Sequence, residues 1–354
     1  WTRGFEWGDL GRNLLSNGYC FDLVNDDALQ RPARFDGQSL RIGEQCYGVP
    51  LVPNIEALPV ESFRRIAAYA EQGGVVVALE RVPEASCGLK NRETDGQEVR
   101  DLAARLFQRP SGRDGMGLEA HSSKRTYGQG TTYWFEQVLD RSNVLDRHAG
   151  AFDPFLRALR RHVTPDFGID LVRESLREND GLCFTHRRAG NREIYFVANV
   201  QDRAVDLRAT FRVTDAAPWA WDPYTGEVAA IGEYVALDGV TTVPLRLAPY
   251  ASTFVVFERG ERRPHATSSS LEWIESADDR SVVGWTDRGG AHFVRLDGGE
   301  VRRARADAPA GPSRISGPWD LVLESPTFPR YATRMDELAS WTESAETKHF
   351  SGTG

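Results

Sequence analysis

The chain has 354 residues and a net charge of −8, which is enough for two or three domains that each bury a core of their own. Its basic residues are nearly all Arg and are interleaved with acids, so we expect no nucleic-acid partner. No apolar run approaches the roughly 20 residues that cross a bilayer and no signal-peptide pattern opens the chain, so we expect no membrane partner.

The first part of the chain alternates apolar runs with helical patterns. Three runs read as buried strands: FDLV from Phe21, YGVPLVP from Tyr47 and VVVAL from Val75. Two amphipathic helices have apolar residues at i, i+3, i+4 and i+7: Phe63, Ile66, Ala67 and Ala70 in one, and Val99, Leu102, Ala103 and Leu106 in the other. This alternation predicts a flavodoxin-like α/β domain with parallel strands over residues 1–150, in which YGQGTTYWF from Tyr127 is a hairpin or an edge strand.

After Pro165 the helical patterns give way to short alternating strands with turn residues between them. They are LCFTH at Leu182, EIYFVANV at Glu193, LRATFRV at Leu207, WDPYTGEV at Trp221, TTVPLRL at Thr241 and STFVVFE at Ser252. Their spacing predicts a β-sandwich over residues 151–262. We expect its core to be formed by Ile194, Phe196 and Ala198 from one strand and by Phe254 and Val256 from another.

The polar stretch ERRPHATSSS from Glu261 predicts a linker, followed by a few exposed strands. We expect residues 263–312 to form this linker with its short strands, and residues 313–354 to form the start of another β domain. The chain begins with Trp1 and its last residues, KHFSGTG, resemble a strand that runs into a turn. Both features predict a piece of a longer protein, in which the strands after Ser313 lack partners or borrow contacts from the linker.

Chemistry-bearing residues are sparse. Cys87 follows the VVVAL strand, the position of the nucleophile in glutamine amidotransferases, but no His-x-Glu pair follows to supply a base, so an inert loop cysteine is the stronger interpretation. The cysteines have neither C-x-x-C spacing nor a nearby His, and YGQG lacks a following helix with Lys. We therefore expect no metal and no cofactor.

Glycoside hydrolysis requires two carboxylates on either side of the scissile bond. Glu6 and Asp9 in FEWGD are the only pair that stands out near the start, and two acids in such a segment are more often solvated. We therefore assign no catalytic residue.

Four residues are candidates for contact with carbohydrate. His186 and Arg187 in THRR could bind an anion or a sugar hydroxyl, although the end of a strand at the rim of the sandwich is the stronger interpretation. Trp319 and Trp341 could stack on sugar rings, although Trp in such folds is more often core.

The order of these motifs, from NGYCFDLVNDDAL through YGVPLVPNIEALPVESFRRIAAYAEQGGVVV, YGQGTTYW, HRRAGNREIYFVANV, WDPYTGEV, VPLRLAPYASTFVVFE and ISGPWDLVLE to LASWTESAETKHFSGTG, resembles the C-terminal half of bacterial α-L-rhamnosidases of glycoside hydrolase family 106. The resemblance implies an amidotransferase-like, trimerisation-like α/β domain, then a β-sandwich and the start of a galactose-binding-like jelly roll. In that family the catalytic barrel comes first, and none of its glutamates maps onto this chain.

The resemblance further implies a non-catalytic portion of an enzyme that hydrolyses terminal rhamnosyl linkages in plant or bacterial glycans, with the glycan bound through the barrel and a secreted or periplasmic location. Two alternatives remain open. One is the tail of a β-galactosidase-like hydrolase, and the other is a non-catalytic carbohydrate-binding or scaffolding protein. The oligomeric state is not predicted.

Overall fold

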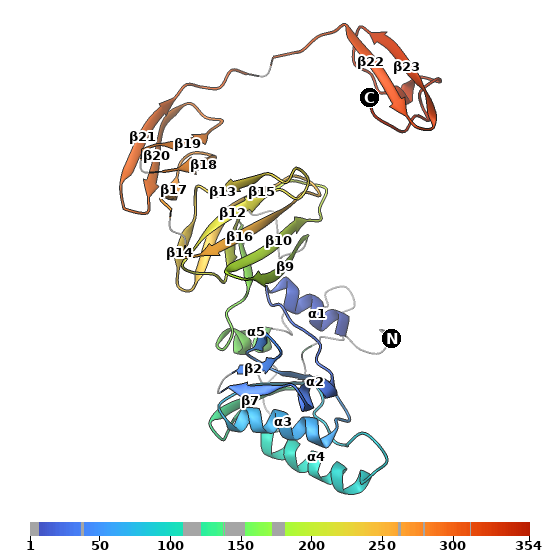
Figure 1. Ribbon diagram of the computed structural model, residues 1–354, viewed down its shortest axis with the longest axis vertical. Helices are drawn as coiled ribbons and strands as arrows, with labels where there is room; N and C mark the ends of the chain where they lie inside the picture. Colours follow the sequence, from blue (N-terminus) through green and yellow to red (C-terminus); the bar gives the residue numbers. More distant parts are fainter. Residues whose placement is uncertain are drawn as a thin grey trace, which may run out of the picture. The chain divides into compact units, whose positions relative to one another are not determined.

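The computed structural model describes residues 7–36, 39–108, 122–136, 138, 153–171, 181–260, 263–278, 280–311 and 313–354. These residues form a mixed α/β structure with most strands in several small sheets (Figure 1). The chain divides into two compact units. The first unit comprises Trp1–Trp285 with Phe293–Arg302, and the second comprises Thr286–His292 with Arg303–Gly354.

The first unit begins with a four-stranded sheet that has helices on both faces (Figure 1). Its strand order is β4 (Leu51–Pro53), β5 (Val75–Leu79), β7 (Gly130–Phe135) and β6 (Ser122–Tyr127). The β4–β5 and β5–β7 pairs are parallel, and β6 runs antiparallel to β7. The continuous apolar run of β5 is explained by burial on both faces, as is usual for parallel strands.

The helices bury the apolar stripes that their periodicity predicts. Helices α3 (Val60–Glu71) and α4 (Arg92–Leu106) pack in one core with Val76 and Ala78, while α1 (Trp7–Ser16) and α5 (Asp153–Arg160) pack in the other with Val77 and Leu79. The two predicted helices and the β4 and β5 strands are therefore confirmed.

The predicted hairpin at YGQGTTYWF is confirmed as β6–β7, which Gly128 and Gln129 connect. Gly130 is required at the start of β7, since a Cβ there would lie 2.1 Å from the carbonyl oxygen of Ala70 and 2.2 Å from that of Gly74. The hairpin is thus held directly against the end of α3 by a close backbone approach.

The predicted strand at Phe21 is wrong. Residues 21–24 form neither helix nor strand, and α2 (Asp26–Gln30) follows at once, capped by the Asn25 side chain, which accepts a hydrogen bond from the Ala28 N–H at 2.9 Å. The cap begins a helix where a strand would have to continue. Beyond α2 lies a small antiparallel sheet of β1 (Arg34–Asp36), β2 (Ser39–Ile42) and β3 (Gln45–Tyr47).

Two antiparallel sheets then pack on one shared core, which we call the sandwich. The five-stranded sheet has the order β13 (Val228–Ala230), β12 (Ala216–Trp221), β16 (Ser252–Arg259), β10 (Arg192–Asn199) and β9 (Leu182–Ala189). The four-stranded sheet has the order β14 (Val235–Leu237), β15 (Val240–Leu247), β11 (Val205–Phe211) and β8 (Phe167–Leu171). Five of the six predicted segments lie in these sheets, and the sixth, WDPYTGEV, forms the turn that connects β12 to β13.

The core face of β10 is the opposite of the expected one. Tyr195 and Val197 are fully buried in the shared core, whereas Phe196 is half-buried and lies directly across from Phe254 of the neighbouring strand, with ring centroids 5.0 Å apart. Because β10 and β16 are neighbours in one sheet, these two rings lie side by side on its outer face rather than meeting across the core. The alternation favoured the wrong face, because Ile194, Phe196 and Ala198 are all apolar whereas the face that enters the core also carries Glu193 and Asn199.

Beyond the sandwich, a small core of Ala266, Ile274, Val294 and Leu296 joins two further sheets. One contains β17 (Ala266–Ser269), β20 (Gly290–Leu296) and β21 (Val301–Ala306), and the other contains β18 (Trp273–Ala277) and β19 (Val282–Trp285). The short strands expected after the linker are therefore present.

The second unit contains the antiparallel hairpin of β22 (Trp319–Ser325) and β23 (Phe328–Met335) and a 3-10 turn, η2 (Trp341–Glu343). Thr353 and Glu324 exchange two backbone hydrogen bonds of 2.9 Å, and Phe350 is buried. The expectation that the strands after Ser313 lack partners or borrow them from the linker is therefore wrong for the described residues, because these strands pair with one another.

Candidate functional site

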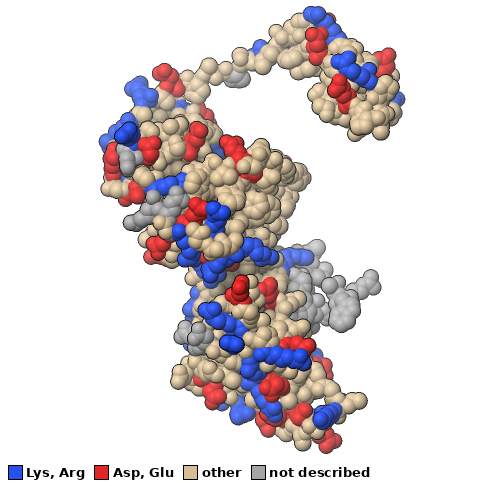
Figure 2. Space-filling model, viewed as in Figure 1, with Lys and Arg blue, Asp and Glu red and all other residues tan. Residues whose placement is uncertain are grey.

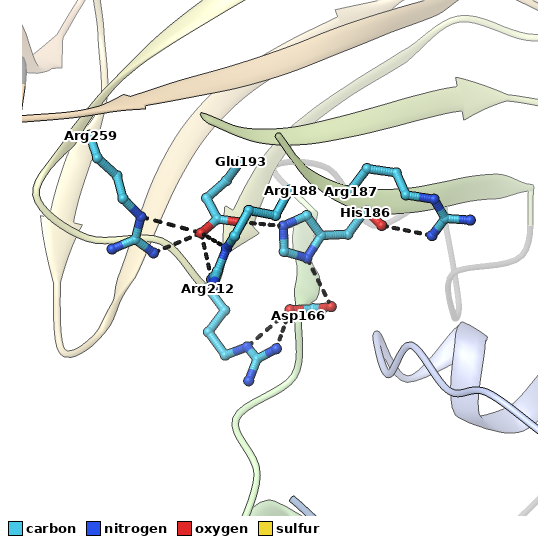
Figure 3. A network of polar contacts seen from close by, with 7 residues as sticks. All are labelled: Asp166, His186, Arg187, Arg188, Glu193, Arg212 and Arg259. Carbon is cyan, nitrogen blue, oxygen red and sulfur yellow. Dashed lines mark hydrogen bonds and ion pairs between the residues drawn. The ribbon is translucent and has the colours of Figure 1, made fainter. Parts of the chain in front are cut away.

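A cluster of ionisable side chains lies among the first strands of the sandwich and includes one of the predicted site residues (Figure 3). His186, on β9, has one ring nitrogen on each of two carboxylates. Its Nδ1 is 3.2 Å from Asp166 Oδ2, and its Nε2 is 2.9 Å from Glu193 Oε2. Asp166 immediately precedes β8 and Glu193 is on β10, so the contacts link both sheets of the sandwich.

The register of β9 and β10 fixes the position of this histidine. His186 is the cross-strand partner of Tyr195, and the two rings stack with centroids 4.0 Å apart and planes 6° from parallel. Tyr195 is fully buried, and its hydroxyl has no hydrogen-bond partner in the part of the chain that the structure describes. Stacking on a core tyrosine holds the imidazole in the plane that reaches both carboxylates.

Three arginines complete the cluster. Arg188 and Arg259 both donate to the same oxygen, Glu193 Oε1, with their Nη2 atoms at 2.7 and 2.8 Å. Arg212 donates to Asp166 Oδ1 through Nε at 2.9 Å and Nη2 at 2.5 Å. Each carboxylate oxygen therefore lies within hydrogen-bond distance of a guanidinium or imidazole nitrogen.

These contacts keep both acids ionised. Burial alone would raise the pKa of Asp166, but the hydrogen bond to His186 and the charge of Arg212 outweigh it and lower the pKa to about 2. Burial also opposes ionisation of Glu193, and the hydrogen bonds from Arg188, Arg259 and His186 more than offset it, so its pKa is lowered too. Neither group can deliver a proton near neutral pH.

Cys20 borders the cluster but is not activated by it. Partial burial of its thiol, followed by the charge of Asp166 and a hydrogen bond to it, raises the pKa of Cys20 to about 12. Since the thiolate is the nucleophile, this cysteine is unreactive at neutral pH.

Glu233, the third buried carboxylate of the described residues, lies elsewhere in the sandwich and has a different environment. Burial raises its pKa, and the charge of Arg208, whose Nη2 is 3.1 Å away, only partly compensates. A raised pKa is one property of a general acid, but hydrolysis of a glycoside needs a second carboxylate across the bond, and Asp166 and Glu193 are fully engaged with cations. No second acid is available among the described buried residues.

The other residues weighed from the sequence do not form a reactive site. Cys87 lies in an exposed loop, and partial burial of the thiol followed by the charge of Asp26 raises its pKa, which agrees with an inert cysteine. Glu6 lies outside the described residues, and Asp9 lies on α1. No group of three or more His, Cys, Asp and Glu side chains is arranged to hold a metal ion within the described ranges.

The four predicted carbohydrate contacts do not form one site. His186 is only 16% exposed and belongs to the cluster, so its interpretation as the end of a strand at the rim is wrong. Arg187 points to the other side, where its Nη1 donates to the His186 carbonyl oxygen at 2.9 Å (Figure 3). Trp319 is on β22, and Trp341, which packs edge-on against Phe350, is in η2, so both lie in the second unit. Contact with a sugar stays a prediction for all four.

Sequence reasoning missed the partners of His186, namely Asp166, Glu193 and the arginines. One signal could have found Glu193, since it shares the period of Tyr195 and Val197, the face that enters the core. An acidic residue at a core-facing position of a strand predicts that cationic side chains pair with it. Asp166 and Arg212 had no comparable signal, because they lie at the ends of strands that meet only in the folded chain.

The described residues thus combine a helix-covered sheet, a two-sheet sandwich that carries the ionisable cluster, and further small sheets. A sequence profile described as α-L-rhamnosidase, glycoside hydrolase family 106, matches residues 11–236. The chain belongs to this family.

Two individual proteins are also similar to this chain. The structure of a rhamnosidase from Novosphingobium sp. PP1Y is similar to 94% of this chain with 22% sequence identity and a TM-score of 0.56, which shows a shared fold. A protein from Formosa agariphila described as a putative beta-glucuronidase is 24% identical over 262 residues, or 73% of this chain. The chain spans 25% of the first protein and 19% of the second.

Proposed function

We propose that this chain is a non-catalytic accessory portion of an α-L-rhamnosidase-like glycoside hydrolase that acts on terminal rhamnosyl linkages of plant or bacterial glycans. The observation that supports this most directly is the pairing of the buried carboxylates. Asp166 and Glu193 are held by arginines on one side and by His186 on the other. A carboxylate that is buried and kept ionised by cations has no proton to give to a leaving oxygen, and its charge is already neutralised by its partners, which weakens it as a base.

The finer architecture is part of the same proposal. We assign residues 1–150 to an amidotransferase-like α/β domain, 151–262 to a β-sandwich, 263–312 to a linker with short strands, and 313–354 to the start of a galactose-binding-like jelly roll. Burial of β5 between two helical layers supports the first assignment, and the shared core of the two sheets supports the second.

The glycan substrate would be bound by a catalytic barrel elsewhere in the longer enzyme. Hydrolysis there would invert the anomeric carbon, with one carboxylic acid acting as general acid and one carboxylate as general base. A secreted or periplasmic location is proposed on the family resemblance.

No helix among the described residues is long and apolar enough to cross a membrane. Acidic and basic side chains are interleaved over the face shown in Figure 2.

The direct test is hydrolysis of chromogenic aryl glycosides by the purified chain. We expect no release of product above a buffer blank from aryl α-L-rhamnoside, aryl β-galactoside or aryl β-glucuronide. The β-glucuronide is included because of the description of the Formosa agariphila relative, and the β-galactoside because of the alternative weighed from the sequence. Turnover of any of them that disappears in Glu233→Gln would overturn the non-catalytic assignment.

The non-catalytic carbohydrate-binding alternative makes a separate prediction. If Trp319 or Trp341 forms a sugar platform, a neutral rhamnose-containing oligosaccharide should bind and should quench tryptophan fluorescence. Trp319→Ala or Trp341→Ala should then abolish binding, whereas Trp285→Ala, which removes an exposed tryptophan from β19, should not. If the Trp319 and Trp341 variants both behave like the unchanged chain, neither tryptophan forms a sugar platform.

A further inference from the structure

The charges of the cluster are separated by depth. The two carboxylates, Glu193 and Asp166, are 1% and 7% exposed, whereas Arg188, Arg259 and Arg212 are 67%, 49% and 44% exposed. Three guanidinium groups therefore lie above two buried acids. Whatever the charge of the imidazole between them, positive charge exceeds negative charge, and the excess is on the solvent side.

Each arginine uses only part of its donor set. Arg188 and Arg259 contact Glu193 through Nε and Nη2, and Arg212 contacts Asp166 through the same two atoms. No contact of the three Nη1 groups occurs in the part of the chain that the structure describes. Within the described residues, three groups of N–H donors on these partly exposed side chains are therefore not used by the cluster.

The three guanidinium groups belong to one cluster. Arg188 and Arg259 share a single carboxylate oxygen, so both guanidinium carbons lie within a few ångströms of Glu193 Oε1. His186 contacts both Glu193 and Asp166, the carboxylate that pairs with Arg212. The charge of Asp166 also contributes to the raised pKa of Arg188. A ligand oxyanion above Glu193 would meet donors from at least two arginines.

The buried acids also hold these side chains in place before any ligand arrives. A long, exposed arginine normally loses rotamer freedom when it binds, and here the contacts with Glu193 and Asp166 have already restricted it. Guanidinium groups bind planar carboxylates and sulfate groups through paired N–H donors. Neutral sugars gain nothing comparable from the excess charge.

We propose that Arg188, Arg212 and Arg259 form a binding site for an oxyanion, the carboxylate or sulfate group of an acidic glycan. The choice of a glycan rests on the proposed function, whereas anion binding follows from the cluster alone. The aryl-glycoside assay measures hydrolysis and not anion binding, so it can fail or succeed independently of this proposal.

The test is calorimetric titration of the full chain at low salt with three oligosaccharides: trigalacturonate, a sulfated trisaccharide and neutral maltotriose. We expect one or both acidic probes to bind and maltotriose not to bind. Arg188→Gln should weaken binding by about tenfold, the value of one charge-assisted contact, and it leaves Glu193 paired with Arg259 and His186. Binding to trigalacturonate alone would identify the carboxylate source, and binding to the sulfated probe alone the sulfate source.

Arg203→Gln is the matched control, because Arg203 follows the opposite end of β10 and donates to Gln201. It should leave binding unchanged. A second readout uses the unchanged chain: trigalacturonate should protect Arg188 from phenylglyoxal, as followed by peptide mass spectrometry, and should leave Arg203 reactive. No binding of either acidic probe, equal binding of maltotriose, binding of inorganic sulfate only, or insensitivity to Arg188→Gln each overturns the proposal.

Discussion

The four-stranded sheet with its helices on both faces, which we call the α/β layer, and the sandwich bury their strands in different ways. The buried polar residues of the α/β layer are uncharged, namely Asn13, Ser62 and Thr132. All three buried carboxylates of the described residues, Asp166, Glu193 and Glu233, lie in or beside the strands of the sandwich. Helices close the α/β sheet on both faces, whereas the strand ends of a two-sheet sandwich leave an edge of the core that side chains must close. We therefore expect the stability of the sandwich to depend on buried charge and the stability of the α/β layer not to.

Glu193→Ala should have the largest effect, a loss of about 3 to 5 kcal/mol in the free energy of unfolding, because it strips the buried partner from two arginines and His186. Urea unfolding followed by far-UV circular dichroism measures the loss. Glu258→Ala is the control, since Glu258 pairs with Arg192 on the outer face and should cost at most about 1 kcal/mol. Equal losses in the two variants would contradict a charge-dependent core.

His186→Ala should cost about 2 to 3 kcal/mol, since it removes one hydrogen bond from each buried carboxylate and uncovers the Tyr195 ring. A histidine on an exposed rim, as the sequence suggested, would make this substitution nearly silent. His349→Ala, a change at an exposed histidine of the second unit, is the control and should be nearly silent. A silent His186→Ala would restore the rim interpretation.

Acid should weaken the sandwich before the α/β layer. The pKa of Asp166 is about 2 in the folded chain and about 3.8 when unfolded, so its stabilisation is complete above pH ~4 and is lost as pH falls toward 2. The expected loss is about 2 kcal/mol. Hydrogen exchange, corrected for intrinsic rates, should show protection falling in β10 while β5 stays protected.

Asp166→Asn is the matched variant for this pH experiment. It should make the stability of the sandwich lower at pH 7 and reduce its dependence on pH between 4 and 2, and the remaining dependence comes from other acids such as Glu193, whose pKa is also lowered. If β5 and β10 lose protection together in the unchanged chain, the two regions unfold as one and the comparison does not hold.

Phe196→Ala should have the smallest effect, about 1 kcal/mol, well below the ~3 to 5 kcal/mol typical of a fully buried phenylalanine. Phe196 lies on the outer face of the sheet beside Phe254, where water fills the space that a truncation leaves. Thermal unfolding followed by circular dichroism is sensitive enough to measure this. A loss above ~3 kcal/mol would show that another surface covers this face in solution.

The secondary structure of the chain was largely predictable because local patterns carry it. Helix α3 follows from the spacing of Phe63, Ile66, Ala67 and Ala70, and β5 from an unbroken apolar run. Phe21 was misassigned, since a short apolar run does not distinguish a strand from the irregular segment before a capped helix. His186 was singled out correctly as an unusual residue but was given the wrong surroundings.

The amino-acid sequence by itself determined the alternation of helices and strands, the change to all-β structure after Pro165 and the family resemblance, because periodicity, turn residues and motif order are local properties. Only the tertiary structure decided which face of β10 enters the core and which side chains surround His186. Asp166, Glu193 and Arg212 come from three separate segments and meet through strand register and sheet packing. Long-range contacts of this kind have no periodicity along the chain, so they depend on the fold as a whole.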